Sequence, residues 1–268
     1  MLGSGSRGNA LLVESQGDAL LVDAGFSLKD LLRRCTHAGR DASKVRAIAL
    51  THEHGDHSRG AARAAAEWGV PIAASAGTLH ALRGTLPDAA ATITLSPSRA
   101  VAVGAFLITA YPTAHDAREP SMLVVEDAEG RRVGVAYDVG SPTAALRHAC
   151  RGLDALVIES NHDEVMLRSS AYPASVRARI AGRAGHLSNR EAAELAAQVA
   201  HAGMSAVILA HLSDRCNRAE LAVEAMKAAL GRTAFEGTIV VALQDVPTEP
   251  IEIGDALGQL VLPLGGGH

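Results

Sequence analysis

Aromatic residues are scarce in this sequence. Phenylalanine, tyrosine and tryptophan make up 3% of the 268 residues although 48% are hydrophobic, so the core must consist mainly of aliphatic side chains. No hydrophobic run approaches the ~18 residues of a membrane span. The first residues, MLGSGSRGNA, lack the basic and apolar regions of a signal peptide. We therefore expect a globular protein of the cytoplasm.

Cysteine and lysine are also rare. The three cysteines, Cys35, Cys150 and Cys216, are far apart and lack the paired spacing of a metal or redox site, so we expect free thiols in a reducing compartment. Lysine occurs 3 times against 22 arginines, a bias that we attribute to genome composition. The net charge of −4 argues against a surface that binds nucleic acid everywhere, and a local basic patch remains compatible with it.

Short apolar segments alternate with helical patterns along the chain. Ser27 and Gly39 frame one predicted helix, and Ser188 with Glu191 has the pattern of a capping box. Residues 101–111 read as one strand. We expect a single α/β domain over residues 1–246, in which two mixed sheets pack face to face under helices as a four-layer αββα sandwich. Residues 247–268 are expected to form a peripheral C-terminal tail.

Coordinating side chains crowd residues 50–60, LTHEHGDHSRG, directly after a predicted buried strand. Imidazole and carboxylate groups together suit zinc, manganese or iron, and the lack of cysteine argues against a structural zinc knuckle. His52 and His54 are two apart and can share one ion, while Asp56 and His57 follow on a turn and face a neighbouring position. A solvated polar loop would rarely show this pattern, so we predict two metal ions.

Three more candidate ligands follow predicted strands elsewhere. His115, Asp138 and His211 each stand where a strand ends, and open α/β sheets bind ligands at the carboxyl ends of their strands. Each residue alone is compatible with an ordinary loop histidine or a capping aspartate. Together they supply two imidazoles and a carboxylate able to bridge two ions.

With these residues the sequence resembles metallo-β-lactamase-fold hydrolases, whose signature is THEHGDH followed by a histidine, a bridging aspartate and a last histidine. The resemblance implies the αββα sandwich and two divalent metal ions. It also implies the roles of the site residues: His52, His54 and His115 hold the first ion, Asp56, His57 and His211 hold the second, Asp138 bridges them, and Asp23 in LLVDAG orients the metal loop.

The segments GSGSRGN, IESNHDEVMLRSSAYPASVRARIAGRAGHLSNREAA and LAHLSDRCNRAELA are similar to the YycJ/WalJ branch of that family, which is related to phosphodiesterases and RNase Z-type nucleases. This likeness implies a 5′-to-3′ DNA exonuclease that acts on DNA ends. A hydroxide between two zinc or manganese ions, with iron as another option, is the expected nucleophile, and phosphoester hydrolysis suits it.

Other residues are candidates for catalysis or substrate binding. His186 stands between a glycine and a helix start and is the predicted general acid, with His162 as its alternative or partner. The catalytic set is Asp56, His186 and His162. Backbone donors of loop 3–9 and the helix start at Ser188 are predicted to bind phosphate, which makes Ser4, Ser6, Asn9 and Ser188 the substrate-binding set. Arg177, Arg179 and Arg183 are candidate phosphate contacts, and a solvated helix face explains them equally well.

Three other functions are compatible with the pattern. A small-molecule hydrolase of the same fold would act on a cyclic phosphodiester, a thioester or a lactone. A diiron oxidoreductase of this fold is disfavoured, because such relatives carry glutamate where this chain has His54. A metal-binding scaffold without activity is disfavoured because every expected ligand is present.

Overall fold

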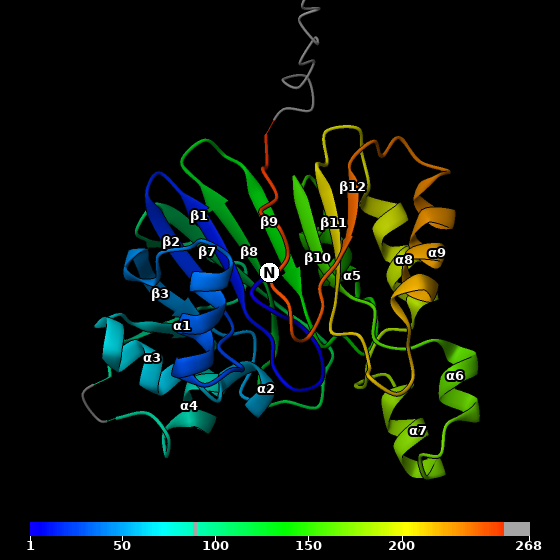
Figure 1. The fold of residues 1–268 in the computed structure, drawn as a ribbon, viewed down its shortest axis with the longest axis horizontal. Coiled ribbons are helices and arrows are strands. Elements are labelled where there is room, and N and C mark those ends of the chain that lie inside the picture. Colours follow the sequence, from blue (N-terminus) through cyan, green and yellow to red (C-terminus); the bar gives the residue numbers. More distant parts are fainter. Residues whose placement is uncertain (88–89, 255–268) are drawn as a thin grey trace, which may run out of the picture.

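The computed structural model describes residues 1–87 and 90–254, which form two β-sheets stacked face to face (Figure 1). The first sheet has the order β1-β2-β3-β4-β5, with β1 and β2 antiparallel and the others parallel. Its strands are β1 (Leu11–Ser15), β2 (Asp18–Val22), β3 (Val45–Ala49), β4 (Ile72–Ala74) and β5 (Thr92–Thr94).

The second sheet has the order β12-β11-β10-β9-β8-β7-β6. Strands β9 to β12 are parallel, and β6 to β9 are joined by antiparallel pairing. The strands are β6 (Val101–Val103), β7 (Phe106–Pro112), β8 (Ser121–Asp127), β9 (Arg132–Ala136), β10 (Ala155–Glu159), β11 (Ala206–Ala210) and β12 (Thr238–Val241).

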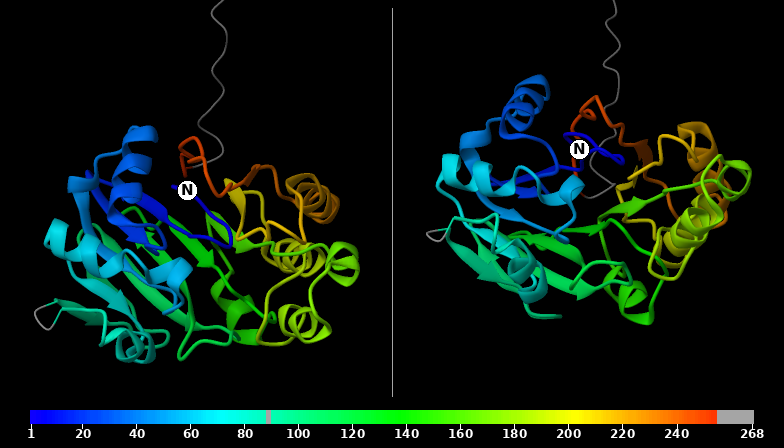
Figure 2. Two further views of the ribbon diagram at one scale, coloured as in Figure 1. Left: turned by 60° about the horizontal axis from the view of Figure 1, so that its bottom comes forward. Right: turned by 90° about the horizontal axis from the view of Figure 1, so that it is seen from below.

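Helices cover the outer faces of both sheets (Figure 2). The first sheet carries α1 (Leu28–His37), α3 (Ala61–Trp68) and α4 (Ala76–Leu82), and the second carries α5 (Ala144–Ala149), α8 (Asn189–Val199) and α9 (Ala219–Leu230). Three further helices are short: α2 (Gly55–Ser58), α6 (Glu164–Ser169) and α7 (Ala174–Ile180). A 3-10 turn at Ala42–Lys44 precedes β3. The predicted four-layer αββα sandwich is confirmed.

The core is aliphatic, as the composition predicts. Between the sheets, Leu20, Val22, Ile108 and Val157 are at most 1% exposed and pack with Phe106. Full burial of each such side chain contributes about 1.5–3 kcal/mol. Two further apolar clusters join each sheet to its own helices. The sheets therefore form a rigid base for the loops that leave the carboxyl ends of their strands.

Local end signals in the sequence match the structure well. Ser27 accepts a hydrogen bond from the backbone of α1, and Gly69 ends α3 in the left-handed conformation. Ser188 and Glu191 form the predicted capping box of α8. The three cysteines are buried and free, and burial raises the pKa of Cys35 to about 11 and that of Cys150 to about 12. In the part of the chain that the structure describes, no helix has the length and apolarity to span a membrane.

Two expectations about the elements were wrong. Residues 101–111 do not form one strand: β6 and β7 are separate, and Gly104 turns the chain between them with a positive φ of 56°. The uninterrupted apolar pattern concealed this hairpin. Helices α4 and α6 were not predicted, although Ser75 and Asp163 cap them with their side chains.

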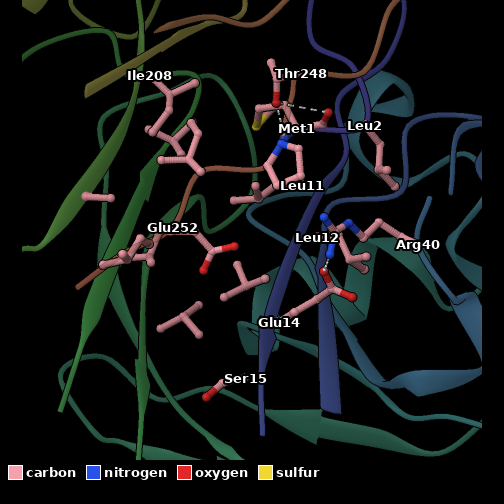
Figure 3. Close-up of a pocket in the computed structure, with 18 of the residues that line it drawn as sticks. Met1, Leu2, Leu11, Leu12, Glu14, Ser15, Arg40, Ile208, Thr248 and Glu252 are labelled. Carbon is pink, nitrogen blue, oxygen red and sulfur yellow. Dashed lines mark hydrogen bonds and ion pairs between the residues drawn. The ribbon is translucent and has the colours of Figure 1, made fainter. Parts of the chain in front are cut away.

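The described part of the predicted tail, residues 247–254, packs partly against the domain. The Thr248 N–H donates to the Met1 carbonyl, and Ile251 and Ile253 pack against the core between the sheets. This segment and β1 flank a pocket of about 260 Å³ with Ile208 on its wall, shown in Figure 3. None of its lining residues belongs to the predicted catalytic or metal-binding set. Residues 255–268 lie outside the described part of the chain.

Candidate metal centre

The predicted ligands and the predicted orienting residue Asp23 converge at the carboxyl ends of strands from both sheets. Asp23 follows β2 directly, Asp138 follows β9 and His211 follows β11. All three have left-handed backbones, with φ values of 58°, 46° and 53°. This conformation costs a residue other than glycine roughly 1–3 kcal/mol, and it persists at sites where the surroundings enforce it. The strand ends therefore turn sharply, and their side chains meet at one place.

The side chains form two groups that share one carboxylate. In each group, one ligand atom from every residue lies within 4.8 Å of the others. We call them the first ligand group (His52, His54, His115 and Asp138) and the second ligand group (Asp56, His57, Asp138 and His211). These are the two sets that the sequence predicted.

The spacing of the donor atoms suits a metal ion. Donors around a tetrahedral ion with bonds of ~2.1 Å lie about 3.4 Å apart. The Asp138 Oδ2 atom lies 3.3 Å from His52 Nε2 and 3.3 Å from His115 Nε2. In the second ligand group, Asp56 Oδ2 lies 3.5 Å from His57 Nε2 and 3.3 Å from His211 Nε2.

A buried nitrogen without a protein partner supports the same fit. His52 Nε2 accepts or donates no hydrogen bond within the described residues, although its side chain is 1% exposed. Buried polar atoms are nearly always bonded. A cation bound between this nitrogen and Asp138 would satisfy both, so the residues present fit a divalent metal ion.

Hydrogen bonds fix which nitrogen faces the ion positions in three of the five histidine ligands. His57 Nδ1 lies 2.6 Å from Asp23 Oδ2, His115 Nδ1 lies 3.0 Å from the Gly185 carbonyl, and His211 Nδ1 lies 2.9 Å from Glu159 Oε1. Since these oxygens only accept, each Nδ1 carries the proton. The Nε2 atoms of all three rings then face the ion positions, and His57 Nε2 also lies 3.1 Å from Asn9 Nδ2.

Asp23 lies beneath the metal loop. It is fully buried, accepts hydrogen bonds from the Thr51 N–H and hydroxyl at 2.8 Å each, and holds His57. Such a carboxylate fixes the ring orientation of a histidine ligand and raises its basicity. Through these hydrogen bonds Asp23 links the end of β2 to the loop after β3.

Asp23→Asn is expected to weaken metal binding by ~10–100-fold while every ligand remains, which is typical when the partner of a histidine ligand is lost. Competition with a chromophoric chelator measures the affinity. Asp18→Asn is the matched control, because Asp18 begins β2, the strand that Asp23 follows, and pairs with Arg46 away from the metal loop. An unchanged affinity in the Asp23 variant would remove the orienting role from Asp23.

Negative charge dominates the centre. Burial lowers the pKa of His57, but Asp138 and Asp23 outweigh it and raise that pKa to about 10. Burial also lowers the pKa of His211, but Asp138 outweighs this effect and raises the pKa of His211 well above its usual value. The protein therefore attracts positive charge here, and divalent ions supply it more fully than protons do.

Glu159, at the end of β10, is a site residue that the sequence analysis missed. It is fully buried and accepts hydrogen bonds from the Val139 and Leu187 N–H groups. Its Oε1 atom lies 2.6 Å from His186 Nδ1 as well as contacting His211. Burial raises its pKa, but the interaction with His186 dominates and lowers it to about 2. Its place at a strand end, as for Asp138, was the available signal.

His186 belongs to neither ligand group, but its ligand atom lies within 4.8 Å of those of Asp138, Glu159 and His211, with which it forms a third cluster. Its ring centroid is 5.2 Å from that of His115 and 5.3 Å from that of His211. The side chain is 19% exposed, whereas its partner Glu159 is 0% exposed. Glu159 occupies Nδ1, so Nε2 is the ring nitrogen left for a substrate.

The other predicted catalytic residue, His162, lies apart from these groups. It is 2% exposed, its backbone pairs with Ser188, and burial lowers its pKa. Ser188 is 1% exposed. Its hydroxyl donates a hydrogen bond to the Glu191 carboxylate and accepts one from the Glu191 N–H in the cap of α8. Neither residue meets the metal ligands among the contacts of the described chain.

Loop 3–9 does not have the predicted form of a phosphate cradle. The backbone N–H groups of Ser4, Gly5, Arg7, Gly8 and Asn9 all donate to protein acceptors, which include Gln244 and Asp56. Ser6 is exposed, whereas the side chains of Ser4 and Asn9 are buried. The donors that were expected to face a substrate face the protein instead.

The three arginines on and just after α7 divide into two kinds. Arg177 donates to the carbonyls of Ser170 and Tyr172, and Arg179 pairs with Asp116 at 2.8 Å. Arg183 is exposed and makes no ion pair within the described residues. It is the arginine of this set that is left for a phosphate.

Comparisons with known proteins agree with this geometry. The model of one family, described as the beta-lactamase superfamily domain, matches residues 19–212. The exodeoxyribonuclease YycJ of Bacillus anthracis is 33% identical over 238 residues, which are 88% of this chain and 89% of that protein. The exodeoxyribonuclease WalJ of Streptococcus pneumoniae is 30% identical over 226 residues, or 83% of this chain and 84% of that protein.

Solved structures share the fold at lower identity. The metallo-β-lactamase fold protein YhfI from Bacillus subtilis superimposes with a TM-score of 0.68 at 20% identity, over 90% of this chain and 93% of that one. The short form of human tRNase Z gives a TM-score of 0.62 at 16% identity, over 93% of this chain and 98% of that one. At these identities the likeness concerns the fold alone.

Proposed function

The chain belongs to the metallo-β-lactamase superfamily, and on that basis we propose that it is a dinuclear metal-dependent phosphoesterase that degrades DNA from its ends. The observation that carries the proposal is the pair of ligand groups sharing Asp138. The relatives named exodeoxyribonuclease match more than four fifths of the chain, which supports a nuclease.

The first ligand group would hold one divalent ion and the second ligand group the other, with Asp138 between them. Zinc and manganese suit these donors, and iron is compatible. Two ions at such positions supply a Lewis acid for a phosphoryl oxygen and lower the pKa of water. Asp56 belongs to this set as a ligand, which is the catalytic role that we propose for it.

The chain itself supplies orientation and a proton. Asp23 and Glu159 hold the rings of His57 and His211 through their Nδ1 protons. Glu159 also holds His186, and the interaction raises the pKa of His186 against the effect of burial. We propose that His186 Nε2 donates a proton to the leaving oxygen of the phosphodiester. His162 is the reserve candidate for this role.

Substrate profiling tests the proposal. Metal-loaded protein is incubated with single-stranded and duplex DNA, with RNA and with bis-p-nitrophenyl phosphate. We expect cleavage of DNA from one end. Selective hydrolysis of thioesters, lactones or cyclic phosphodiesters, with DNA left intact, would replace the nuclease by the small-molecule hydrolase.

Salt should weaken DNA binding, because bound phosphates release counterions when arginine neutralises them. The dependence should be shallow, since the chain is acidic overall and, of Arg177, Arg179 and Arg183, only Arg183 has a side chain without a protein partner in the described structure. Arg183→Ala is expected to reduce the slope of log Kd against log salt by about 1. Fluorescence anisotropy at several salt concentrations measures it.

Arg63→Ala is the matched control for this measurement, since Arg63 is an exposed arginine on α3. It should leave the slope unchanged. An equal slope for wild type and Arg183→Ala would remove Arg183 from the DNA contact, and no salt dependence at all would argue for a small uncharged substrate.

A further inference from the structure

We propose that Ser4 and Asn9 are positioning residues for the second metal ion, so that loop 3–9 serves the metal centre instead of a substrate phosphate. The inference rests on the proposed dinuclear centre. It follows from hydrogen bonds that join both side chains to the second ligand group, and from the burial of Ser4 and Asn9 at 2% and 0% exposure.

Ser4 supports the backbone of His211. Its Oγ atom accepts a hydrogen bond from the His211 N–H at 2.8 Å and donates to Asn9 Oδ1 at 2.7 Å. His211 has a φ of 53°, a conformation that costs such a residue roughly 1–3 kcal/mol. The hydrogen bond from Ser4 helps to hold this backbone, which aims the imidazole at the second ligand group.

Asn9 connects that support to the metal loop. The Asn9 N–H donates to the Asp56 carbonyl at 2.8 Å, and Asn9 Nδ2 lies 3.4 Å from the same oxygen and 3.1 Å from His57 Nε2. The amide orientation is fixed, because Oδ1 accepts from Ser4 and from the Gly5 N–H while Nδ2 donates to the Gly5 carbonyl.

The backbone around Asn9 is closely packed. The Gly25 N–H donates to the Asn9 carbonyl at 3.0 Å, and a side chain at Gly25 would overlap the Asp56 carbonyl oxygen. The backbones of loop 3–9, the turn after β2 and the metal loop are therefore in direct contact. A shift of Asn9 would move Asp56.

The contacts are selective for one ion. Ser4 and Asn9 touch His211, Asp56 and His57, which are the ligands that belong to the second ligand group alone. Within the described residues, neither hydrogen-bonds with the histidines of the first ligand group. Loss of the Ser4 hydroxyl should therefore affect the second ion and spare the first.

Ser4→Ala would leave the buried His211 N–H without its acceptor, a loss that costs about 1–3 kcal/mol in a protein interior. His211 can relieve that cost by leaving its left-handed conformation, which moves the imidazole. We expect the affinity for the second ion to fall ~10–100-fold, the usual effect of losing a group that orients a ligand. The first ion should bind as in the wild type.

The test is a titration of metal-free protein with zinc in competition with a chromophoric chelator, which resolves the two binding steps without any measurement of activity. Ser160→Ala is the matched control, because Ser160 is fully buried and donates to Asn189 without touching a ligand. Ser4→Thr keeps the hydroxyl. Ser4→Val introduces a side chain of the same shape as threonine that lacks the hydroxyl. If Ser4→Ala does not fold, this isosteric pair carries the comparison.

Selective weakening of the second step in Ser4→Ala and Ser4→Val, with recovery in Ser4→Thr, supports the proposal. Equal weakening of both steps, or the same loss in Ser160→Ala, would overturn it by showing general destabilisation. Two unchanged steps in folded Ser4→Ala would overturn it as well. A wild-type protein that binds a single ion would instead contradict the dinuclear centre on which the inference rests.

Discussion

Asp138→Ala is expected to abolish hydrolysis and to lower the metal content from two ions to one or none. Asp138 belongs to both ligand groups and is 2% exposed. Its Oδ2 atom lies 3.3 Å from His52 Nε2 and 3.5 Å from His57 Nε2, so one oxygen serves both positions. Without this anion, two divalent cations about 4 Å apart would repel each other across a buried space.

Elemental analysis of the purified variant counts the ions, and bis-p-nitrophenyl phosphate reports hydrolysis. Asp154→Asn is a suitable control. Asp154 accepts a hydrogen bond from the Arg132 N–H at the amino ends of β9 and β10, whereas Asp138 lies at the carboxyl end of β9. It should keep two ions and full activity. An active Asp138 variant with two ions per chain would remove the bridging role from Asp138.

His186→Ala is expected to keep both ions while kcat on DNA falls ~10²–10⁴-fold, the usual contribution of a general acid. No ligand of the first or second ligand group is removed. The loss should depend on the leaving group, because a nucleoside alkoxide needs a proton whereas p-nitrophenolate is stable as an anion. The variant should therefore retain far more activity on bis-p-nitrophenyl phosphate than on DNA.

Parallel kcat measurements on the two substrates check this expectation, with metal content as a control for the site. His148→Ala, an exposed histidine on α5, should have no effect on either substrate. Equal losses on both substrates would indicate that His186 positions the phosphate. Unchanged rates on both would dismiss His186 and make His162 the next residue to substitute.

The sequence predicted those features that short stretches of chain determine. His52, His54, Asp56 and His57 follow one strand within six residues, so their convergence needs no knowledge of the rest of the fold. Caps such as Ser27 are equally local. The more distant ligands could be predicted because each of them follows the carboxyl end of a strand, and these ends lie at the same edge of the sheets.

Features that depend on distant partners could not be predicted. Glu159 meets His186 and His211, which lie 27 and 52 residues away in the chain. The glycine-rich loop was misread because its sequence is the same whether its N–H groups face a ligand or the protein. Distant acceptors such as Gln244, which is 237 residues from Arg7 and accepts its N–H, and Asp56, which accepts the Asn9 N–H, turn these groups toward the protein.

The packing of residues 247–254 has the same origin. Gly and Pro in this segment indicated a tail, but Ile251 and Ile253 find apolar surface between the sheets, where the edge strand β1 leaves room. Pairing with the chain start through Thr248 adds to this. The free energy of burial came from the tertiary structure, which the local composition did not reveal.

The most direct test of a metal-dependent nuclease uses DNA oligonucleotides labelled with radioactive phosphate at the 5′ end or at the 3′ end. Protein stripped of metal by a chelator is assayed before and after it is reloaded with zinc or manganese. A 5′-to-3′ exonuclease should release the 5′ label as a mononucleotide and shorten the 3′-labelled strand progressively, only when metal is present. DNA that stays intact with fully loaded protein, or that is cleaved equally without metal, would contradict the account.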